Sequence, residues 1–408
     1  MNFLQLLSKL TSISLLTSIV TLSASLIFAK IMIPEDFGRF SYFQSILMIL
    51  LNFTSFGSGL AIVVYMYNST SKKYSRIFSN VVFVLIPISS VLSFLVLIIL
   101  SLVSSNPIDW VDILLLTLNS LFMVVCLTGV DYLRAKQDIK RYSRYFGGYT
   151  AVVSIGGILG YLLFQSITFL YLTILVGLLL PATLTLLLLR KELKLNLKYK
   201  EKFRTFKWSV KYGVPVVLNS SVMSFMVIGD RILLGDIIEM QALAGYSVAA
   251  LIASTTLFLV NNFANAWGGY ISKVIPKLER KELAFIYYKN RPKLLLAIPL
   301  GILAYIAQII IYKMFYEEAY PGLESIILIL TAGYCFLGMS KYFVGFLSCL
   351  GKNNQVLYSS VLGCCVMILT SMVFFRGSLS GMAVAVSISF LVQLFMCNFF
   401  ANKLIKTE

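Results

Sequence analysis

Charged side chains stand inside, or at the ends of, long apolar runs in this chain. Asp230 and Arg231 end one such run in GDRILLGDIIEM, Lys341 lies inside another, and Lys30 lies near the end of the first. A lysine or arginine in an apolar setting can bind an anionic group such as a phosphate, and the planar guanidinium can do so with two hydrogen bonds. The first chemistry that the sequence indicates is therefore anion binding inside an apolar environment.

Hydroxyl and amide side chains recur at helical spacing in the same runs. Steps of 3, 4, 3 and 4 place five hydroxyl residues on one face of the first run: Thr11, Ser14, Ser18, Thr21 and Ser25. Steps of 7, 7 and 4 give a second stripe in the eighth run, formed by Ser247, Ser254, Asn261 and Asn265, with Asn262 beside it. Further polar residues in the second and seventh runs include Gln44, Asn52 and Asn219. Serine also lets helices pack closely, but the amides and the two stripes together predict a water-filled cavity between two halves of the chain.

The depth of each cation leaves two interpretations open. Lys341 lies 17 residues after Glu324 and 11 before Lys352, which places it roughly 16 Å from the inner loop at 1.5 Å per residue. It therefore either faces the protein interior or snorkels along the helix to the surface. Arg231 and Lys30 lie near the outer ends of their runs. Each is equally consistent with an interfacial anchor and with a cation of the cavity.

Residues typical of catalysis or cofactor binding are scarce. The chain has no histidine, and its six cysteines fall in or beside apolar runs without CxxC spacing, as expected of small packing residues. No GxxxxGK[ST] or GxGxxG motif occurs. We therefore expect no cofactor, no metal site and no enzymatic activity.

The elements that carry these residues are predicted to be membrane-spanning helices. Of the 408 residues, 59% are hydrophobic and 12% are charged, whereas soluble domains have about 25% charged residues. Twelve apolar runs have the length needed to cross roughly 30 Å of hydrocarbon. The spans are approximately 10–33, 40–66, 78–103, 110–133, 146–165, 168–189, 209–233, 243–267, 292–315, 322–348, 356–375 and 379–401.

Basic residues fall mainly on one side of the predicted spans. With both termini in the cytoplasm, 29 of the 34 lysines and arginines lie on the inner side, as the positive-inside rule requires. The net charge of +17 is therefore explained by topology, with a smaller share for attraction of anionic membrane lipids. Nucleic acid is not an expected partner.

The chain is predicted to consist of two similar halves. Gly38 corresponds to Gly245, Pro87 to Pro299 and Lys136 to Lys352, at offsets of 207, 212 and 216 residues. Because each half has an even number of spans, six, both halves begin on the same side of the membrane and form a parallel repeat. We expect an N-terminal six-helix bundle at 1–189, a basic linker at 190–208 that includes an interfacial helix, and a C-terminal bundle at 209–408, around a central cavity.

Two segments carry a family resemblance. LIFAKIMIPEDFGRFSYFQSI from Leu26 and DRILLGDIIEMQALAGYSVAALI from Asp230 resemble Wzx-type polysaccharide flippases of the multidrug/oligosaccharidyl-lipid/polysaccharide exporter superfamily. In that family the seventh helix ends in an Asp-Arg pair, and the eighth begins with a Gly-Tyr-Ser-like motif, here Gly245, Tyr246 and Ser247. LRAKQDIKRYS from Leu133 is similar to an inner-loop region of the same family.

The resemblance implies a flippase of the bacterial cytoplasmic (inner) membrane. It would carry an undecaprenyl-pyrophosphate-linked oligosaccharide from the inner to the outer leaflet for O-antigen (lipopolysaccharide) or capsule synthesis, with a polysaccharide polymerase and a chain-length regulator as partners. A drug exporter or a peptidoglycan-precursor flippase would share the fold, and a drug exporter should carry buried carboxylates in its spans. A membrane-embedded polymerase or ligase would need a large outer loop, and a scaffold would have little use for aligned polar stripes.

Overall fold

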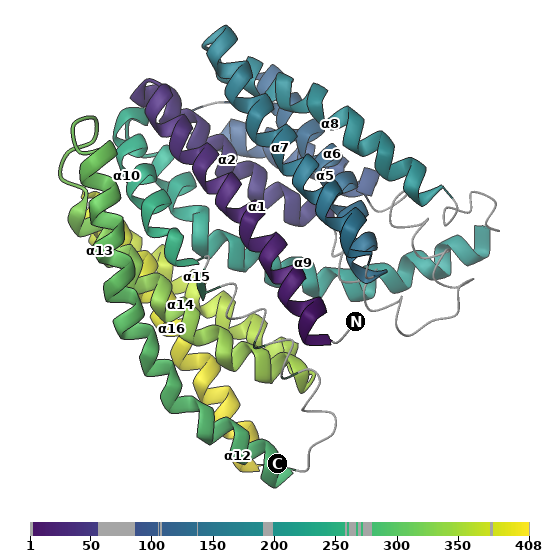
Figure 1. Ribbon diagram of the computed structural model, residues 1–408, viewed down its shortest axis with the longest axis vertical. Coiled ribbons are helices and arrows are strands. Elements are labelled where there is room, and N and C mark those ends of the chain that lie inside the picture. Colours follow the sequence, from purple (N-terminus) through teal and green to yellow (C-terminus); the bar gives the residue numbers. More distant parts are fainter. Residues whose placement is uncertain are drawn as a thin grey trace. The chain divides into compact units, whose positions relative to one another are not determined.

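The computed structural model describes residues 3–55, 86–104, 106, 108–136, 138–190, 199–257, 259–260, 267, 271, 280–375 and 378–407 (Figure 1). These residues form helices, turns and short connections, with no strand in the described ranges. The helices are, in chain order, α1 (Phe3–Ile31), α2 (Pro34–Ser55), α5 (Ile86–Val103), α6 (Trp110–Ala135), α7 (Ile139–Phe164), α8 (Ile167–Leu189), α9 (Tyr199–Gly235), α10 (Met240–Ala253), α12 (Arg280–Asn290), the 3-10 helix η3 (Arg291–Leu296), α13 (Ala297–Phe315), α14 (Glu324–Cys349), α15 (Asn353–Phe374) and α16 (Leu379–Thr407).

Each of the twelve spans expected from the sequence overlaps a helix of the described part, although residues 56–66 and 78–85 lie outside it, and the predicted all-α membrane fold is confirmed. Ten helices of the described part are long and apolar enough to cross a bilayer, and Leu16–Ile31 is a shorter apolar helix. Two boundaries differ from the expectation. The seventh span is part of a 37-residue helix that begins at Tyr199, so the end of the basic linker continues directly into α9. The eighth helix, α10, ends at Ala253, and Ser254 forms a turn.

The early end of α10 is stabilised by a glutamine from another helix. Gln308 of α13 is 1% exposed, and its Nε2 donates to the hydroxyls of Thr255 and Thr256 at 2.8 and 2.9 Å. The Thr331 hydroxyl of α14 donates to Gln308 Oε1 at 2.6 Å. Within hydrocarbon a broken helix is tolerated only where protein groups satisfy its polar atoms, and one amide does so here.

The chain divides into two compact units. Unit 1 comprises Met1–Ser224 and Ile232–Gln241, and unit 2 comprises Phe225–Arg231 and Ala242–Glu408. The division lies inside α9, beyond the basic segment at 190–208. Because the short segment Ile232–Gln241 belongs to unit 1, the chain leaves unit 1, enters unit 2, returns to unit 1 and then completes unit 2.

Small residues set the helix spacing inside unit 1, where α7 packs against α8 and α1, and α6 packs against α8, α2 and α5. Gly156 and Gly160 form a GxxxG pair on α7. A Cβ at Gly160 would lie 2.0 Å from the Thr173 hydroxyl oxygen of α8, and that hydroxyl donates to the Gly156 carbonyl at 2.9 Å. Backbones that approach this closely gain van der Waals contact, which is how helices associate in lipid.

Unit 2 is built around α14 and α16, which pack along each other, with α15 against α16 and α13 against α14. A Cβ at Gly333 of α14 would lie 2.5 Å from the Ser387 hydroxyl oxygen of α16, and this hydroxyl donates to the Ile329 carbonyl at 2.8 Å. Helix α13 is different, because only its residues Gln308 and Tyr312 are buried. Its remaining large apolar side chains are left for lipid.

The returning segment of unit 1 is held by polar residues from the first part of the chain. Asp236 accepts hydrogen bonds from the hydroxyls of Tyr42, at 3.3 Å, and Ser104. Asn106 Nδ2 donates to the Gly235 carbonyl at 2.6 Å. We refer to Tyr42, Ser104, Asn106 and Asp236 as the return clasp.

The close approach of α2 to this segment requires a glycine. A Cβ at Gly38 would lie 1.9 Å from the Met240 carbonyl oxygen, whereas a Cβ at Gly147 would meet nothing within 4 Å. We expect Gly38→Ala to lower the thermal unfolding temperature in detergent, because backbone must shift to admit the methyl group. Gly147→Ala is the matched control, and its higher helix propensity should leave stability unchanged or raise it by up to about 1 kcal/mol. Equal unfolding temperatures for the two variants would show that the close approach does not constrain the fold.

A buried carboxylate also joins three helices of unit 1. Asp112, in the first turn of α6, is 2% exposed. Its Oδ2 lies 3.1 Å from the Arg39 guanidinium of α2, and its Oδ1 accepts the Thr168 hydroxyl of α8 at 2.8 Å. The same guanidinium lies 3.5 Å from Asp109, whose side chain is 78% exposed.

One arginine thus contacts a buried and an exposed acid, which allows a matched comparison. We expect Asp112→Ala to destabilise the protein by about 1–3 kcal/mol, because Thr168 and Arg39 lose a buried acceptor. Asp109→Ala should cost less than about 1 kcal/mol, as exposed ion pairs do. Thermal unfolding in detergent measures both, and an equal effect of the two substitutions would contradict this account.

Candidate functional site

A buried carboxylate lies near the end of α9, at the Asp-Arg pair noted in the sequence. Asp230 is 0% exposed. Its Oδ1 accepts the backbone N–H of Arg231 at 2.8 Å, and its Oδ2 accepts the Tyr246 hydroxyl of α10 at 2.6 Å. Tyr246 is itself fully buried. Ionisable groups inside membrane spans are costly and usually serve a function. The Asp230–Arg231 pair is therefore the centre of the candidate site.

Arg231 lies next to this carboxylate without forming an ion pair with it. Successive residues are about 100° apart around a helix, so the Asp230 carboxylate takes the arginine's backbone N–H and not its guanidinium. The Nε of Arg231 is buried and has no hydrogen-bond partner among the described residues. A buried charged donor without an acceptor is unfavourable, and an anionic ligand would satisfy it.

Lys341 lies on α14 of unit 2, about two helical turns beyond Tyr334. Tyr334 of α14 lies near Asp230 and Arg231, and Lys341 follows seven residues later, on the same face of the helix. Tyr334 packs on Phe390 of α16 with ring centroids 5.9 Å apart, and Lys341 lies near Cys397, which follows Phe390 by seven residues. The two helices therefore run side by side in the same direction, and Lys341 lies about 10 Å along the axis from Tyr334.

The lysine lies well inside the helix. It is eight residues before the end of α14 at Cys349, or about 12 Å along the axis. Its side chain is partly buried, and no ion pair or hydrogen bond joins its ammonium to another residue in the part of the chain that the structure describes. The geometry thus presents two cations, at Arg231 and Lys341, with no carboxylate in an ion pair with either.

Two hydroxyls of the predicted stripe on α1, Thr21 and Ser25, bond to carbonyls of their own helix. The Thr21 hydroxyl donates to the Thr17 carbonyl at 3.0 Å, and Ser25 donates to the Thr21 carbonyl at 3.1 Å. Thr21 is exposed, and Ser18 and Ser25 are partly buried. The side chains of Thr11 and Ser14 lie outside the described residues, and a role for this stripe in a cavity stays a prediction.

Polar residues of the second and seventh spans do come together inside unit 1. Asn52 of α2 donates to the Ser224 hydroxyl of α9 at 2.8 Å. On the same stretch of α9, the side-chain oxygens of Asn219 and Ser221 are buried without a hydrogen-bond partner among the described residues. This group of hydroxyls and amides has unused capacity to bind a polar ligand.

The other residues selected from the sequence have different surroundings or lie outside the described residues. Gln44 is partly buried on α2, and Lys30 is exposed in the last turn of α1. The Ser254 hydroxyl donates to the Leu251 carbonyl at 2.6 Å. Asn261, Asn262 and Asn265 lie outside the described residues.

Three polar contributors were missed in the sequence, namely Asp112, Gln308 and the tyrosine that binds Asp230. Asp112 and Gln308 were not selected from the sequence, and Tyr246 was noted only as part of a family motif. Buried carboxylates, the feature expected of a drug exporter, are present, since Asp230 and Asp112 are 0% and 2% exposed.

Comparison with known proteins identifies relatives of the fold. A sequence profile for a family described as "Polysaccharide biosynthesis protein" matches residues 4–275. No curated protein matches the chain. A multidrug resistance MATE family transporter of the MOP superfamily, in an inward-facing conformation, is 12% identical with a TM-score of 0.70, and the match covers 96% of this chain and 95% of that one.

Two further solved structures are similar over most of their length. The lipid II flippase MurJ, in an inward closed conformation, is 16% identical with a TM-score of 0.74, and the match covers 96% of this chain and 87% of that one. A MOP superfamily transporter from Pyrococcus furiosus is 13% identical with a TM-score of 0.63, over 98% and 95% of the two chains. At these identities the likeness establishes the fold and leaves the cargo open.

The tyrosine that binds Asp230 offers a test of the site's integrity. We expect Tyr246→Phe to destabilise the protein by about 1–3 kcal/mol, because a buried carboxylate oxygen loses its donor. Tyr334→Phe is the matched control: Tyr334 is 1% exposed, and its hydroxyl makes no hydrogen bond to a described residue. A double-mutant cycle of Tyr246→Phe with Asp230→Asn, followed by thermal unfolding in detergent, should give a coupling of about 0.5–3 kcal/mol. Additive effects would mean that the hydrogen bond contributes nothing.

Proposed function

Because the chain belongs to the polysaccharide biosynthesis protein family, we propose that it is a flippase for a lipid-linked oligosaccharide. Its cargo is an undecaprenyl-pyrophosphate-linked repeat unit, which it moves from the inner to the outer leaflet of the bacterial cytoplasmic membrane by alternating access. The product serves O-antigen or capsule synthesis, with a polysaccharide polymerase and a chain-length regulator as partners.

The observation that supports this proposal is the pair of cations in unit 2, Arg231 and Lys341, which form no ion pair with any carboxylate of the described residues. A pyrophosphate crossing the membrane needs positive groups that no carboxylate has neutralised. Arg231 has a buried, unpartnered Nε, and Lys341 lies about two helical turns along α14 from Tyr334, the neighbour of Arg231. At an effective dielectric constant of about 20, a cation 4 Å from a unit negative charge gains roughly 4 kcal/mol, which is comparable with the cost of keeping that cation in the membrane.

The polar residues of unit 1 suit the other part of the cargo. A sugar presents hydroxyl groups that both donate and accept hydrogen bonds. The unpartnered oxygens of Asn219 and Ser221, together with the Asn52–Ser224 pair, offer such partners on the second and seventh spans. We infer that this group contacts the glycan while the cations of unit 2 contact the pyrophosphate.

A drug exporter is the second candidate, and the burial of Asp230 is the observation that favours it. A fully buried carboxylate could attract an organic cation that enters the protein. The Tyr246 hydroxyl and the Arg231 backbone already bind both of its oxygens, however, so the acid is engaged structurally. A cationic dye loaded into proteoliposomes separates the two functions, because dye export that Asp230→Asn abolishes would favour the exporter.

The flippase is tested with a labelled lipid-linked glycan in proteoliposomes and a leaflet-resolved readout. We expect the protein to move the label between leaflets, and we expect Lys341→Ala and Arg231→Ala each to slow this by about ten-fold or more, which corresponds to about 1.4 kcal/mol in the barrier. Arg231→Lys should keep substantial activity, because a point charge still attracts phosphate. Lys313→Ala is the control, since Lys313 is an exposed cation in the last turn of α13.

Four outcomes bear on this proposal in different ways. No movement of the glycan by the unmodified protein would overturn the flippase. If Lys341→Ala moves the glycan as fast as the parent protein at matched protein level, Lys341 snorkels to the surface and does not bind the cargo. If Arg231→Ala keeps full activity, Arg231 is an interfacial anchor. Faster movement of a peptidoglycan precursor than of the oligosaccharide would reassign the cargo.

A further inference from the structure

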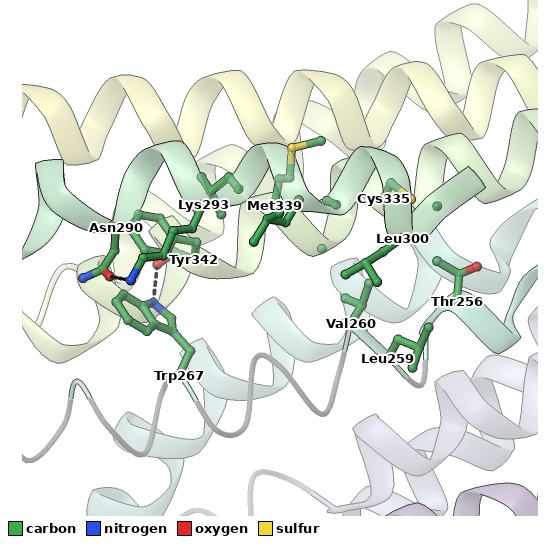
Figure 2. A pocket seen from close by; sticks show the side chains of 15 residues that line it. Thr256, Leu259, Val260, Trp267, Asn290, Lys293, Leu300, Cys335, Met339 and Tyr342 are labelled. Carbon is green, nitrogen blue, oxygen red and sulfur yellow. Dashed lines mark hydrogen bonds between the residues drawn. The ribbon is translucent and has the colours of Figure 1, made fainter. Parts of the chain in front are cut away.

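An apolar groove lies in unit 2, and neither Arg231 nor Lys341 is among the residues that line it. It encloses ≈ 320 Å³ between η3 and α13 on one side and α14 on the other, and its walls include Leu300, Gly301, Cys335 and Gly338 (Figure 2). This volume is at the lower end of the range of small-molecule pockets, about 300–1,000 Å³. The groove is therefore large enough for part of a ligand.

The shape of the groove is set by two glycines. A Cβ at Gly301 would lie 2.6 Å from the Cys335 sulfur, and a Cβ at Gly338 would lie 2.7 Å from a methyl carbon of Val260. Its lining runs along the chain from Asn290 to Gly301, roughly 17–20 Å at the rise of 3-10 and α-helices. A long, narrow and apolar space fits a hydrocarbon chain better than a compact ligand.

One end of the groove is polar. Lys293 Nζ donates to Asn290 Oδ1 at 2.9 Å, and Trp267 stacks on Tyr342 with ring centroids 4.8 Å apart. Figure 2 shows these four residues together at one end, with Leu300, Cys335 and Thr256 toward the other. An ammonium group has three N–H donors, and no described carboxylate forms an ion pair with Lys293. Donors therefore remain for a phosphate oxygen at this end.

The groove is also open to the lipid phase. Leu296 and Leu300, which line it, are 59% and 57% exposed on the poorly buried outer side of the η3–α13 helix. Tryptophan is enriched at the level of lipid headgroups, and Trp267 is only partly buried. An apolar channel that ends in a cation and aromatic rings matches one chain of a phospholipid together with its phosphate.

We propose that this groove binds an anionic phospholipid of the surrounding bilayer, with one acyl chain between α13 and α14 and the phosphate at Lys293. A polyprenyl chain is much longer than the groove and would leave most of its length outside. The site is thus distinct from that of the transported lipid, and it does not depend on the proposed flippase activity.

Trp267 provides a direct probe, because brominated acyl chains quench indole fluorescence on contact. The chain has three tryptophans, so Trp110→Phe and Trp208→Phe leave Trp267 as the only one in the full-length protein. Brominated phosphatidylglycerol and brominated phosphatidylcholine are titrated into detergent-solubilised protein. We expect phosphatidylglycerol to quench Trp267 at about five-fold lower concentration, as expected for one lysine facing an anionic headgroup.

Two pairs of variants locate the binding. Ala297→Phe fills the groove and should abolish the preferential quenching, whereas Ala307→Phe places the same side chain at an exposed position of α13 outside the groove. Lys293→Gln should make the two lipids equivalent, whereas Lys313→Gln should not. Size-exclusion chromatography shows whether each variant is folded, and if Ala297→Phe is not, the Lys293→Gln comparison decides alone.

Several results would overturn the proposal. Equal quenching by the two lipids in the parent protein would mean that the groove is a non-selective lipid-facing surface. Preferential quenching that survives both Ala297→Phe and Lys293→Gln would place the lipid elsewhere. Undecaprenyl phosphate that displaces brominated phosphatidylglycerol at lower concentration than unlabelled phosphatidylglycerol would assign the groove to the polyprenyl chain.

Discussion

A polar group inside hydrocarbon has no water to bind, so it must find its partner within the protein. Asp230 shows how far this requirement shapes the chain. Its carboxylate takes the backbone N–H of the next residue and the hydroxyl of Tyr246, and this arrangement fixes the end of α9 against the start of α10. The same requirement places Gln308 at the break after α10 and Thr168 at the carboxylate of Asp112. Helix ends and breaks occur where such partners exist.

Groups that do not meet this requirement are therefore informative. The Arg231 Nε and the Asn219 and Ser221 oxygens are buried without a hydrogen-bond partner among the described residues. The partly buried Lys341 forms no ion pair or hydrogen bond with a described residue. The fold itself is shared with multidrug transporters and with a lipid II flippase, so architecture does not distinguish cargoes. Among the groups named here, Arg231 and Lys341 are cationic and lie in unit 2, whereas Asn219 and Ser221 are neutral and lie in unit 1.

Much of this was predictable from the sequence, for physical reasons that also explain what was missed. The length of an apolar run indicates a membrane span directly, so the positions of twelve spans could be predicted. A charged residue within an apolar run can be recognised without knowing the fold, so Asp230, Arg231 and Lys341 were selected. The hydrogen-bond partners of these charges could not be predicted in the same way, because they come from helices that are distant in the sequence. Periodicity gives the face on which Tyr246 or Thr168 lies, but only packing shows that this face meets a carboxylate. The exact end of α10 was missed for the same reason.

The path of the chain between the two units has a consequence for how the protein is made. Ile232–Gln241 belongs to unit 1, yet it is synthesised only after the seven-residue piece Phe225–Arg231 of unit 2. The return clasp needs Asp236 and the Gly38 contact needs Met240, so both stay incomplete until the start of α10 has left the ribosome. Unit 1 therefore cannot finish assembling while its first six spans are alone in the membrane. The two units are interleaved, so no single cut in the polypeptide yields two fragments that each contain one complete unit.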